Sequence, residues 1–253
     1  MNQRILVLIP ARYESSRFPG KPLALVSGKS LIQRVTENCQ QAVQQSQDFD
    51  LEYAVVTDDD RIEEHLKSIG ANVVRVDDDV VSGTERIALA QQRHFAGEWD
   101  FIINLQGDEP LFQADLILEF AKFSLEHNFD ITTLLKPRND VAGLSDSNIV
   151  KCAYEAPLKR CLYFSRESIP HAKSAEELAK NTWYHHIGVY GFRAKALGQF
   201  LELPPAQIEL QERLEQLRAL ANGFSIGAIC TDVELIGVDV PEDVKHVEKL
   251  LDK

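Results

Sequence analysis

The sequence is short of cysteine, of long apolar runs and of basic residues, and each shortage excludes a class of protein. Its four cysteines are Cys39, Cys152, Cys161 and Cys230. They form no CxxC pair, so we expect buried thiols in a reducing compartment rather than a zinc site. No apolar run approaches the roughly 20 residues that span a bilayer, and the N-terminal run is too short for a signal peptide. We therefore expect a cytoplasmic protein with no membrane partner.

Acidic residues outnumber basic ones, 39 to 27, which gives the 253-residue chain a net charge of −12 at pH 7. A general nucleic-acid groove needs a net basic surface, so nucleic acid is not an expected partner. A small anionic substrate remains compatible with this balance if cations are gathered locally. The length suits one large domain or two fused domains.

Short apolar strands alternate with helical patterns over the first hundred residues. Strands are predicted at 5–9, 53–57, 72–76 and 101–105, and helices at 30–43, at 61–69 and from 82 to about 93. This alternation predicts an α/β domain with a mostly parallel sheet, in which ligands bind at the carboxyl ends of strands. Farther along, the patterns predict strands at 131–135, 149–154, 162–164, 187–192 and 225–230, a surface segment at 174–178, one helix at 208–221 and a last helix from 241.

The loop after the first strand gathers three cations, Arg12, Arg17 and Lys21. Arginine offers a fork of donors to phosphate oxygens and lysine a point charge, so the loop suits a nucleoside triphosphate. The alternative is a solvated basic loop. Neither GxxxxGK[ST] nor GxGxxG is present, so this is not a Walker loop, and an NAD-type dehydrogenase is disfavoured.

Further motifs follow this loop along nearly the whole chain. They are VTDD at 56–59, SGTER at 82–86, NLQGDEP at 104–110, LYFSR at 162–166, HIGVY at 186–190, LEQLR at 214–218, GVD at 237–239 and PED at 241–243. Together and in this order they resemble the sugar nucleotidyltransferases, and within them the cytidylyltransferases that act on 3-deoxy-manno-octulosonate (Kdo).

This resemblance implies a doubly wound, mostly parallel α/β fold of the nucleotide-diphospho-sugar transferase type. Within a single domain of residues 1–253, it places the nucleotide-binding core at about 1–130 and 221–253. A smaller sugar-binding and dimerisation portion would lie at about 131–220. The implied reaction converts CTP and Kdo into CMP-Kdo and diphosphate, with Mg²⁺ as cofactor. The implied assembly is a homodimer, and the product is the activated sugar of the lipopolysaccharide inner core.

The resemblance also assigns site residues. The catalytic residues would be Arg12, Lys21, Asp108 and Asp239, with the two aspartates as Mg²⁺ ligands. The nucleotide would contact Pro10, Ala11, Arg12, Arg17, Lys21, Ser82, Gly83, Thr84, Arg86 and Gln106. The 3-deoxy-ulosonic acid would contact Gln106, Arg166, His186, Tyr190, Glu215 and Gln216. Two carboxylates with phosphate oxygens and water suit magnesium, which prefers six oxygens and few protein ligands.

For several of these residues a purely structural role is the alternative. Asp108 would then be a turn residue, Ser82 a helix cap, His186 a core histidine and Glu215 part of a solvated helix face. His185 would point to the opposite face from its neighbour if their strand is regular, so only one of the two should face the site.

Four positions depart from the family pattern. Asp79-Val80-Val81 stands where a His-Gln pair is usual, His171 replaces an aromatic residue, and Gln211 replaces an isoleucine. Val240 replaces a hydroxyl helix cap, at a cost of about 1 kcal/mol. These departures bear on the acceptor rather than on the reaction type, so 8-amino-Kdo or a nonulosonate is an alternative acceptor. A non-catalytic sugar-nucleotide binder is a third alternative, but it would have little need of both metal carboxylates.

Overall fold

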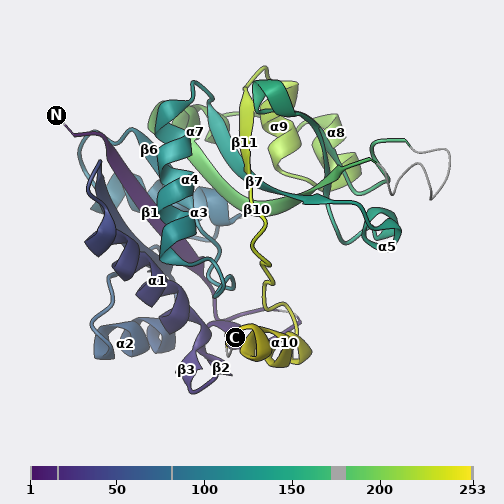
Figure 1. The fold of residues 1–253 in the computed structure, drawn as a ribbon. Helices are drawn as coiled ribbons and strands as arrows, with labels where there is room; N and C mark the ends of the chain where they lie inside the picture. The colour runs from purple at the N-terminus through teal and green to yellow at the C-terminus, as the bar shows by residue number, and fades with distance from the viewer. Residues whose placement is uncertain (1, 16, 81, 172–180, 252–253) are drawn as a thin grey trace. The chain divides into compact units, whose positions relative to one another are not determined.

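The computed structural model describes residues 2–15, 17–80, 82–171 and 181–251 (Figure 1). It divides into two compact units, Met1–Leu125 with Glu234–Lys253, and Glu126–Val233. The second unit therefore contains the strand at 226–230, which the sequence motifs place with the nucleotide-binding core. Within the described ranges, no helix has the length and apolarity needed to cross a membrane.

The sheet of the first unit is parallel and has the order β5-β4-β1-β6. Its strands are β1 (Arg4–Ala11), β4 (Asp50–Thr57), β5 (Val73–Arg75) and β6 (Phe101–Asn104). The side chains from Ile5 to Ile9 are completely buried, as expected for a central strand that is covered on both faces. The chain adds β4 and β5 on one side of β1 and then returns to its other side as β6. The sheet therefore has a topological switch point between β1 and β6, and ligands bind at the carboxyl ends of strands there.

In its described residues the first unit contains five helices, three of which begin at a side-chain N-cap. They are α1 (Leu31–Gln45), α2 (Asp60–Ser68), α3 (Gly83–His94), α4 (Ala114–Glu126) and α10 (Pro241–Leu251), with a short turn η1 (Lys21–Leu23) and a hairpin of β2 (Leu25–Val26) and β3 (Lys29–Ser30). The hydroxyl of Ser82 accepts from Glu85 N at 3.2 Å, so this serine does cap α3. The carboxylate of Asp243 accepts from the backbone N–H of Asp239 at 2.8 Å and of Val240 at 3.0 Å. The N-terminus of α10 is thus capped without a hydroxyl at Val240.

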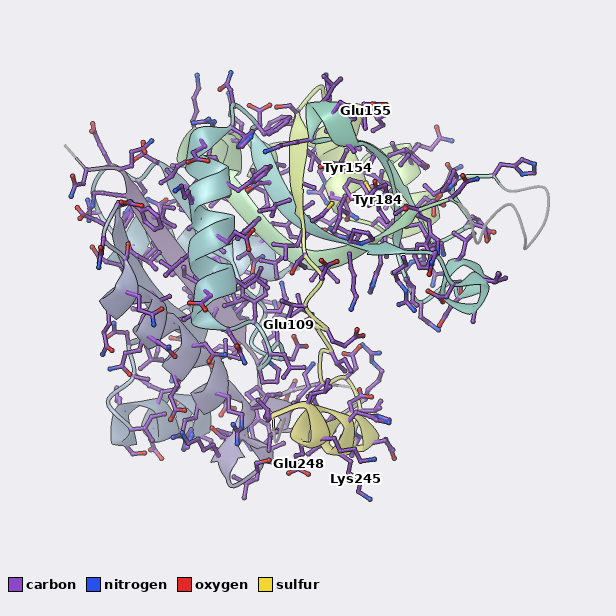
Figure 2. All side chains as sticks on the ribbon, viewed as in Figure 1. Glu109, Tyr154, Glu155, Tyr184, Lys245 and Glu248 are labelled. Carbon is purple, nitrogen blue, oxygen red and sulfur yellow. The ribbon has the colours of Figure 1, made fainter. Side chains whose placement is uncertain are left out.

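The second unit has a mixed sheet in the order β10-β7-β11-β9-β8, and an additional β10–β8 pairing joins its two ends. The strands are β7 (Ile131–Arg138), β8 (Lys151–Glu155), β9 (Arg160–Ser165), β10 (Trp183–Arg193) and β11 (Ile226–Cys230). The helices are α5 (Val141–Ser145), α7 (Ala194–Leu201), α8 (Gln207–Glu212) and α9 (Gln216–Ala221), with a turn η2 (Ala156–Leu158). Its core includes Phe164, Trp183 and Phe200, and the rings of Tyr154 and Tyr184 meet edge to face at 4.9 Å (Figure 2).

Some predictions of secondary structure were wrong. The single helix expected at 208–221 is two helices, because Arg213 takes a left-handed conformation with φ of 57° and ends α8. Helices α4 and α7 were not anticipated. Three of the cysteines are buried free thiols as expected, but Cys230 is exposed. The segment predicted at 174–178 lies outside the described residues.

Candidate functional site

A cleft of about 400 Å³ opens in the first unit at the carboxyl end of β1. Its lining consists of Pro10, Ala11, Arg12, Glu14, Ser15, Arg17, Lys21, Pro22, Gly83, Gln106, Gly107 and Asp108. Most of the residues predicted to contact the nucleotide are in this set, as is one of the predicted metal ligands. They come together because β1, β6 and the N-terminus of α3 all meet at the switch point of the sheet.

Two carboxylates and two cations form a cluster at this cleft. The ammonium of Lys21 donates a short hydrogen bond to the carboxylate of Asp108 and lies 3.6 Å from Oδ1 of Asp239. Nη2 of Arg17 donates to that same Oδ1 at 3.0 Å. Asp108 and Asp239, which are far apart in the sequence, thus share one ammonium group. The structure brings together the pair of aspartates that the sequence motifs single out.

The carboxylate pair has the chemistry of a partial magnesium site. In the described part of the chain, no group of three or more histidine, cysteine, aspartate or glutamate side chains has a metal-binding arrangement. Two carboxylates that reach one cation nevertheless fit Mg²⁺, because this ion usually binds one or two carboxylates and completes its octahedron with substrate phosphates and water. The residues present therefore fit the metal, provided that a phosphate-bearing substrate supplies further oxygens.

Glu109, which is labelled in Figure 2, is a third carboxyl group and follows Asp108 directly in the chain. Its pKa is raised to about 8, mainly by burial and then by the charges of Asp108 and Asp239, against a smaller lowering by Lys21. Its Oε2 has no hydrogen-bond partner among the described residues. After burial, the charges of Asp108 and Asp239 are the next causes of this raised pKa, so negative charge gathers here and favours a bound cation.

Gly107 keeps the floor of the cleft open. A Cβ atom at this position would lie 3.2 Å from the carbonyl oxygen of Pro10 and 3.2 Å from Cδ1 of Ile32. Such a contact is tighter than nearly all real Cβ contacts, so any side chain would push these neighbours apart. The Gly-Asp pair therefore does more than form a turn, since it lets the backbone before Asp108 approach β1 closely.

Arg12 and Arg86 line a second cleft of about 470 Å³, together with Tyr13, Glu14, Asp58, Asp59, Asp77, Asp78, Asp79 and Val80. Nη2 of Arg12 donates to the carbonyl of Val80 at 2.8 Å. The guanidinium of Arg86 is buried and donates to Val76 O at 2.7 Å and to Asp58 at 2.6 Å. Arg86 therefore lines the second cleft and not the first one, and Thr84 is buried within α3.

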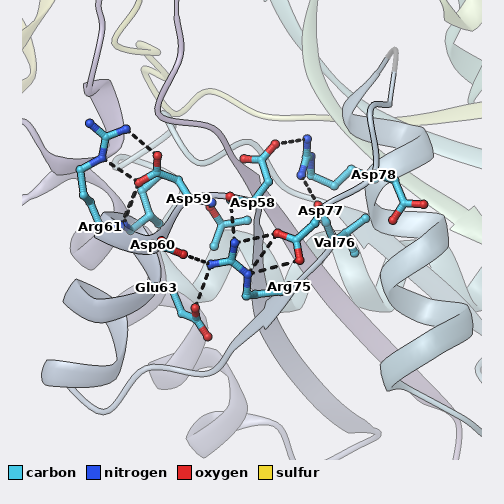
Figure 3. Close-up of polar contacts among 12 residues, drawn as sticks. Asp58, Asp59, Asp60, Arg61, Glu63, Arg75, Val76, Asp77 and Asp78 are labelled. Atoms are coloured by element: carbon cyan, nitrogen blue, oxygen red, sulfur yellow. Dashed lines mark hydrogen bonds and ion pairs between the residues drawn. The ribbon is translucent and has the colours of Figure 1, made fainter.

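Arg75 forms hydrogen bonds with several acidic residues beside this second cleft (Figure 3). Its guanidinium donates to Asp60 at 2.7 Å, to Glu63 at 2.9 Å and to Asp77 at 2.7 Å. It also donates to the backbone carbonyl of Asp58 at 3.1 Å. Many of the carboxylates around this cleft are thus already paired with arginine.

The predicted sugar-side residues lie in the second unit, apart from Gln106. His186, on β10, is 7% exposed, and burial is the main reason that its pKa falls to about 3. Its ring meets Phe164 edge to face at 4.8 Å and lies 5.4 Å from the ring of Tyr190. His186 is therefore neutral at physiological pH. It is a buried core histidine, as the structural alternative expects, and it also belongs to an aromatic cluster with Phe164 and Tyr190. His185 lies on the same strand in register with Lys136 of β7.

Thr133 determines which nitrogen of His186 carries the proton. Its hydroxyl lies 3.0 Å from Nε2 of His186 and 2.8 Å from the carbonyl of Val189, at an irregularity in β10. The single hydroxyl proton goes to the carbonyl oxygen, which can only accept. The oxygen of Thr133 then accepts from Nε2–H, so Nδ1 of the neutral ring is an acceptor.

Glu215 and Gln216 lie at the start of α9, next to this cluster. Burial, and after it the charge of Glu215, raises the pKa of Tyr190 well above its ordinary value. Gln216 is 6% exposed, and its Nε2 has no hydrogen-bond partner among the described residues. A buried amide of this kind is rare in proteins and favours a ligand that would complete it. Glu215 is thus not simply part of a solvated helix face.

Several residues of these sites were not identified from the sequence. Glu109 lies inside the motif 104–110 but was given no role, and a carboxyl next to a predicted metal ligand was a usable signal. The capping role of Asp243 was signalled by its place at the third position of α10. Thr133 had no local signal, because its role depends on the pairing of β7 with β10.

Residues 6–229 match the family model described as Cytidylyltransferase. The chain is 40% identical over 250 residues to the 3-deoxy-manno-octulosonate cytidylyltransferase of Cytophaga hutchinsonii, with 97% of each chain covered. It is 38% identical over 249 residues to the 8-amino-3,8-dideoxy-manno-octulosonate cytidylyltransferase of Shewanella pealeana, with 98% of each covered.

A solved structure agrees with these sequence similarities. The CMP:2-keto-3-deoxy-manno-octonic acid synthetase complexed with CTP matches the chain with a TM-score of 0.88 and 32% identity, over 99% of each chain. The expected α/β fold of the nucleotide-diphospho-sugar transferase type is confirmed, and so is the resemblance seen in the sequence motifs.

Proposed function

We propose, from the fact that the chain belongs to the cytidylyltransferase family, that it activates Kdo with CTP. The products would be CMP-Kdo, for synthesis of the lipopolysaccharide inner core, and diphosphate. The observation that carries this proposal is the cluster of Lys21, Arg17, Asp108 and Asp239 at the nucleotide-sized cleft. It combines phosphate-binding cations with a pair of magnesium-binding carboxylates.

In the proposed reaction the anomeric hydroxyl of the sugar attacks the α-phosphorus of CTP. A new oxygen–phosphorus bond forms, the hydroxyl proton passes to water, the bond to the bridging oxygen breaks, and diphosphate leaves with the released electron pair. Such a transfer depends on positioning and charge neutralisation more than on covalent help. Arg12, Arg17 and Lys21 would bind the triphosphate, and we expect Lys21 to exchange the carboxylate of Asp108 for a phosphate oxygen when CTP binds.

Asp108 and Asp239 would hold Mg²⁺, which when bound polarises phosphate oxygens. The backbone of both segments is held in place without it. The backbone N–H of Asp239 donates to Asp243, and the carbonyl of Asp108 accepts from the backbone N–H of Val238 at 3.0 Å. This backbone pairing aligns the two metal-binding segments.

On the sugar side, the acceptor would be read by the residues of the second unit. Arg166 suits the carboxylate of the acid, and Nδ1 of His186 suits a sugar hydroxyl as donor. The unpaired amide of Gln216 supports a polar ligand at this place. Because a relative is named for the 8-amino acid, 8-amino-Kdo is the second candidate acceptor.

A panel of acceptors tests this proposal. Diphosphate release is measured with CTP or UTP, with Mg²⁺, and with Kdo, 8-amino-Kdo and a nonulosonate as acceptors. We expect release with CTP and Kdo. Release with another acid but not with Kdo would refute the proposed acceptor, and CTP binding without release for any acid would favour a non-catalytic binder.

The metal assignment has its own test. Asp108→Asn keeps the shape of the side chain but removes its charge, so we expect turnover to fall about 100-fold or more, because it weakens charge stabilisation in the transition state. Removal of Mg²⁺ by a chelator should abolish turnover of the wild type. Unchanged turnover in Asp108→Asn, with CTP binding intact, would refute the role of Asp108 as a ligand.

We also propose a homodimer in the cytoplasm. The buried free thiols Cys39, Cys152 and Cys161 support a reducing compartment. The net charge of −12 supports small-molecule substrates rather than nucleic acid as partners.

A further inference from the structure

Lys151 is a lysine without solvent exposure at the start of β8. Its ammonium donates to the backbone carbonyls of Asp146 at 3.1 Å and of Ile149 at 2.9 Å, and makes a short hydrogen bond to the carbonyl of Arg166. An ammonium group has three donors, so these three carbonyls satisfy it fully. Burial lowers the pKa of Lys151, because the charged ammonium is less stable inside the protein than in water.

Glu212, the last residue of α8, forms hydrogen bonds with Ser165 and Arg166, the second of which Lys151 also contacts. Its Oε2 accepts from the backbone N–H of Arg166 at 3.0 Å, and its Oε1 accepts from the hydroxyl of Ser165 at 2.7 Å. Its backbone carbonyl accepts from Nε of Arg166 at 3.1 Å. Arg213 then turns the chain with a positive φ, so that Glu215 and Gln216 follow directly.

The guanidinium of Arg166 is therefore fixed at two of its three nitrogens. Nε is held by the carbonyl of Glu212, and Nη1 donates to the carbonyl of Ser147 at 3.1 Å. Nη2 makes no hydrogen bond to any residue that the structure describes. The backbone N–H and C=O of Arg166 are held by Glu212 and Lys151, one on each side.

We propose that Lys151 and Glu212 are positioning residues that hold Arg166 in one orientation, with Nη2 free for the carboxylate of the sugar acid. This inference rests on the proposed function, in which Arg166 binds that carboxylate. Neither residue touches the substrate. Their effect would be on the affinity for the acid, because a side chain held in its binding orientation loses less conformational entropy when the ligand arrives.

A kinetic comparison on α8 tests the inference. Glu212→Ala removes the carboxylate that accepts from the backbone N–H of Arg166 and from the hydroxyl of Ser165. We therefore expect KM to rise about tenfold or more for the acid that the acceptor panel identifies, with KM for CTP unchanged. Glu212→Gln should restore most of the affinity, because its amide oxygen can accept from Arg166 N–H while its amide donates to Ser165 Oγ. Lys151→Met should raise the same KM, and the Glu212 variants decide the matter if Lys151→Met does not fold.

Glu209→Ala is the matched control. Glu209 is a buried carboxylate on the same helix that accepts from Ala206 N at 2.9 Å and from the guanidinium of Arg218, with no hydrogen bond to Arg166. Its loss should lower Tm and leave KM for the acid unchanged. In an Arg166→Ala background, Glu212→Ala should have no further effect on this KM. Equal changes of KM in Glu209→Ala and Glu212→Ala would overturn the inference, as would an additive effect in that background.

A spectroscopic readout separates this inference from the proposed function. The backbone N–H signal of Arg166, which donates to Oε2 of Glu212 in the wild type, should exchange slowly with water in the wild type and rapidly in Glu212→Ala. Equal exchange rates would refute the positioning role whatever the substrate is. Absence of diphosphate release by the wild type with every acid would refute the proposed function, and the exchange rates would still decide the positioning role.

Discussion

His186 couples the sugar-side cluster to the pH dependence of stability. Its pKa is about 3 in the folded chain, because burial disfavours the charged ring, and about 6.5 in an unfolded chain. Between these values the unfolded state binds more protons than the folded state. Stability should therefore fall as the pH drops from about 6.5 toward 3, by up to about 1.4 kcal/mol per pH unit from this residue alone.

Urea unfolding at several pH values between 4 and 7 measures this effect. We expect His186→Gln to show a shallower loss of the free energy of unfolding in acid than the wild type. His246→Gln, at an exposed histidine on α10, is the control and should follow the wild type. Parallel curves for wild type and His186→Gln would show that another group causes the acid sensitivity.

At the residue scale, the sequence predicted which residues line the cleft better than it predicted which residues their side chains pair with. Arg12, Arg17, Lys21 and Asp108 line the cleft because their motifs lie at the ends of strands that could be recognised from apolar runs. The partners of these side chains were not predictable in the same way. Pairing of Lys21 with both aspartates depends on a tertiary return of the chain at 234–253, which no local pattern reveals.

At the scale of elements, the N-terminus of α3 combines stability and nucleotide binding. Ser82 caps the helix through Glu85 N, and the adjacent Gly83 lines the cleft. Ser82→Ala should cost about 1 kcal/mol of stability through the lost cap. Ser82→Asp keeps an acceptor for the cap but adds a negative charge beside the triphosphate site, so KM for CTP should rise without loss of stability.

Ser30 provides the matched pair of variants, because it caps α1 through Gln33 N but does not line the cleft. Thermal unfolding and steady-state kinetics separate the two effects. Ser30→Ala should lower Tm, and Ser30→Asp should leave KM for CTP unchanged. If Ser82→Asp also leaves KM for CTP unchanged, the predicted contact between this segment and the nucleotide is wrong.

The centre of the second unit depends on a glycine in β11. A Cβ atom at Gly227 would overlap the ring of Phe129, so there is no room for a side chain. We expect Gly227→Ala to destabilise the protein by about 1–3 kcal/mol through overpacking. Phe129→Leu should restore part of that loss in the double variant, because it removes the ring that the methyl group meets. Denaturant unfolding measures both, and purely additive losses would contradict the predicted contact.

The elements that the sequence predicted well are those whose pattern is purely local. The apolar runs of β1, β4 and β6, the start of α2 and the capped start of α3 could be located to within a few residues. The break between α8 and α9 could not, because Arg213 adopts a positive φ without being glycine or asparagine. Residues 208–221 carry one continuous apolar stripe, and tertiary contacts such as that of Glu212 with Arg166 divide it.

At the scale of the whole molecule, the excess of acidic residues over basic ones is also felt in the cleft, where carboxylates pair with the cations. The cations of the first loop are not bare, since Arg17 pairs with Asp239 and Lys21 with Asp108. Composition predicted a local positive patch, whereas the structure shows a nearly neutral cluster that an incoming triphosphate and its metal would rearrange. Affinity for CTP would thus come from exchange of ion pairs rather than from long-range attraction by a basic surface.

The proposed homodimer gives a prediction for the assembled protein. The second unit exposes large apolar side chains, with Leu162 of β9 56% exposed and Leu210 of α8 65% exposed. If a second copy covers this unit, a charge at either position should weaken the dimer, because a charged group is costly to bury. Sedimentation should give the wild type twice the 28.5 kDa of one chain and shift Leu162→Glu or Leu210→Glu toward the single-chain mass.

Leu25 is the matched control, because it is equally exposed at 65% but belongs to the first unit. Leu25→Glu should sediment as the wild type does. Circular dichroism must show that each variant remains folded, so that a lower mass reports dissociation rather than unfolding. A wild type that sediments at 28.5 kDa across micromolar concentrations would refute the dimer. A shift caused by Leu25→Glu alone would instead move the interface to the first unit, near the hairpin of β2 and β3.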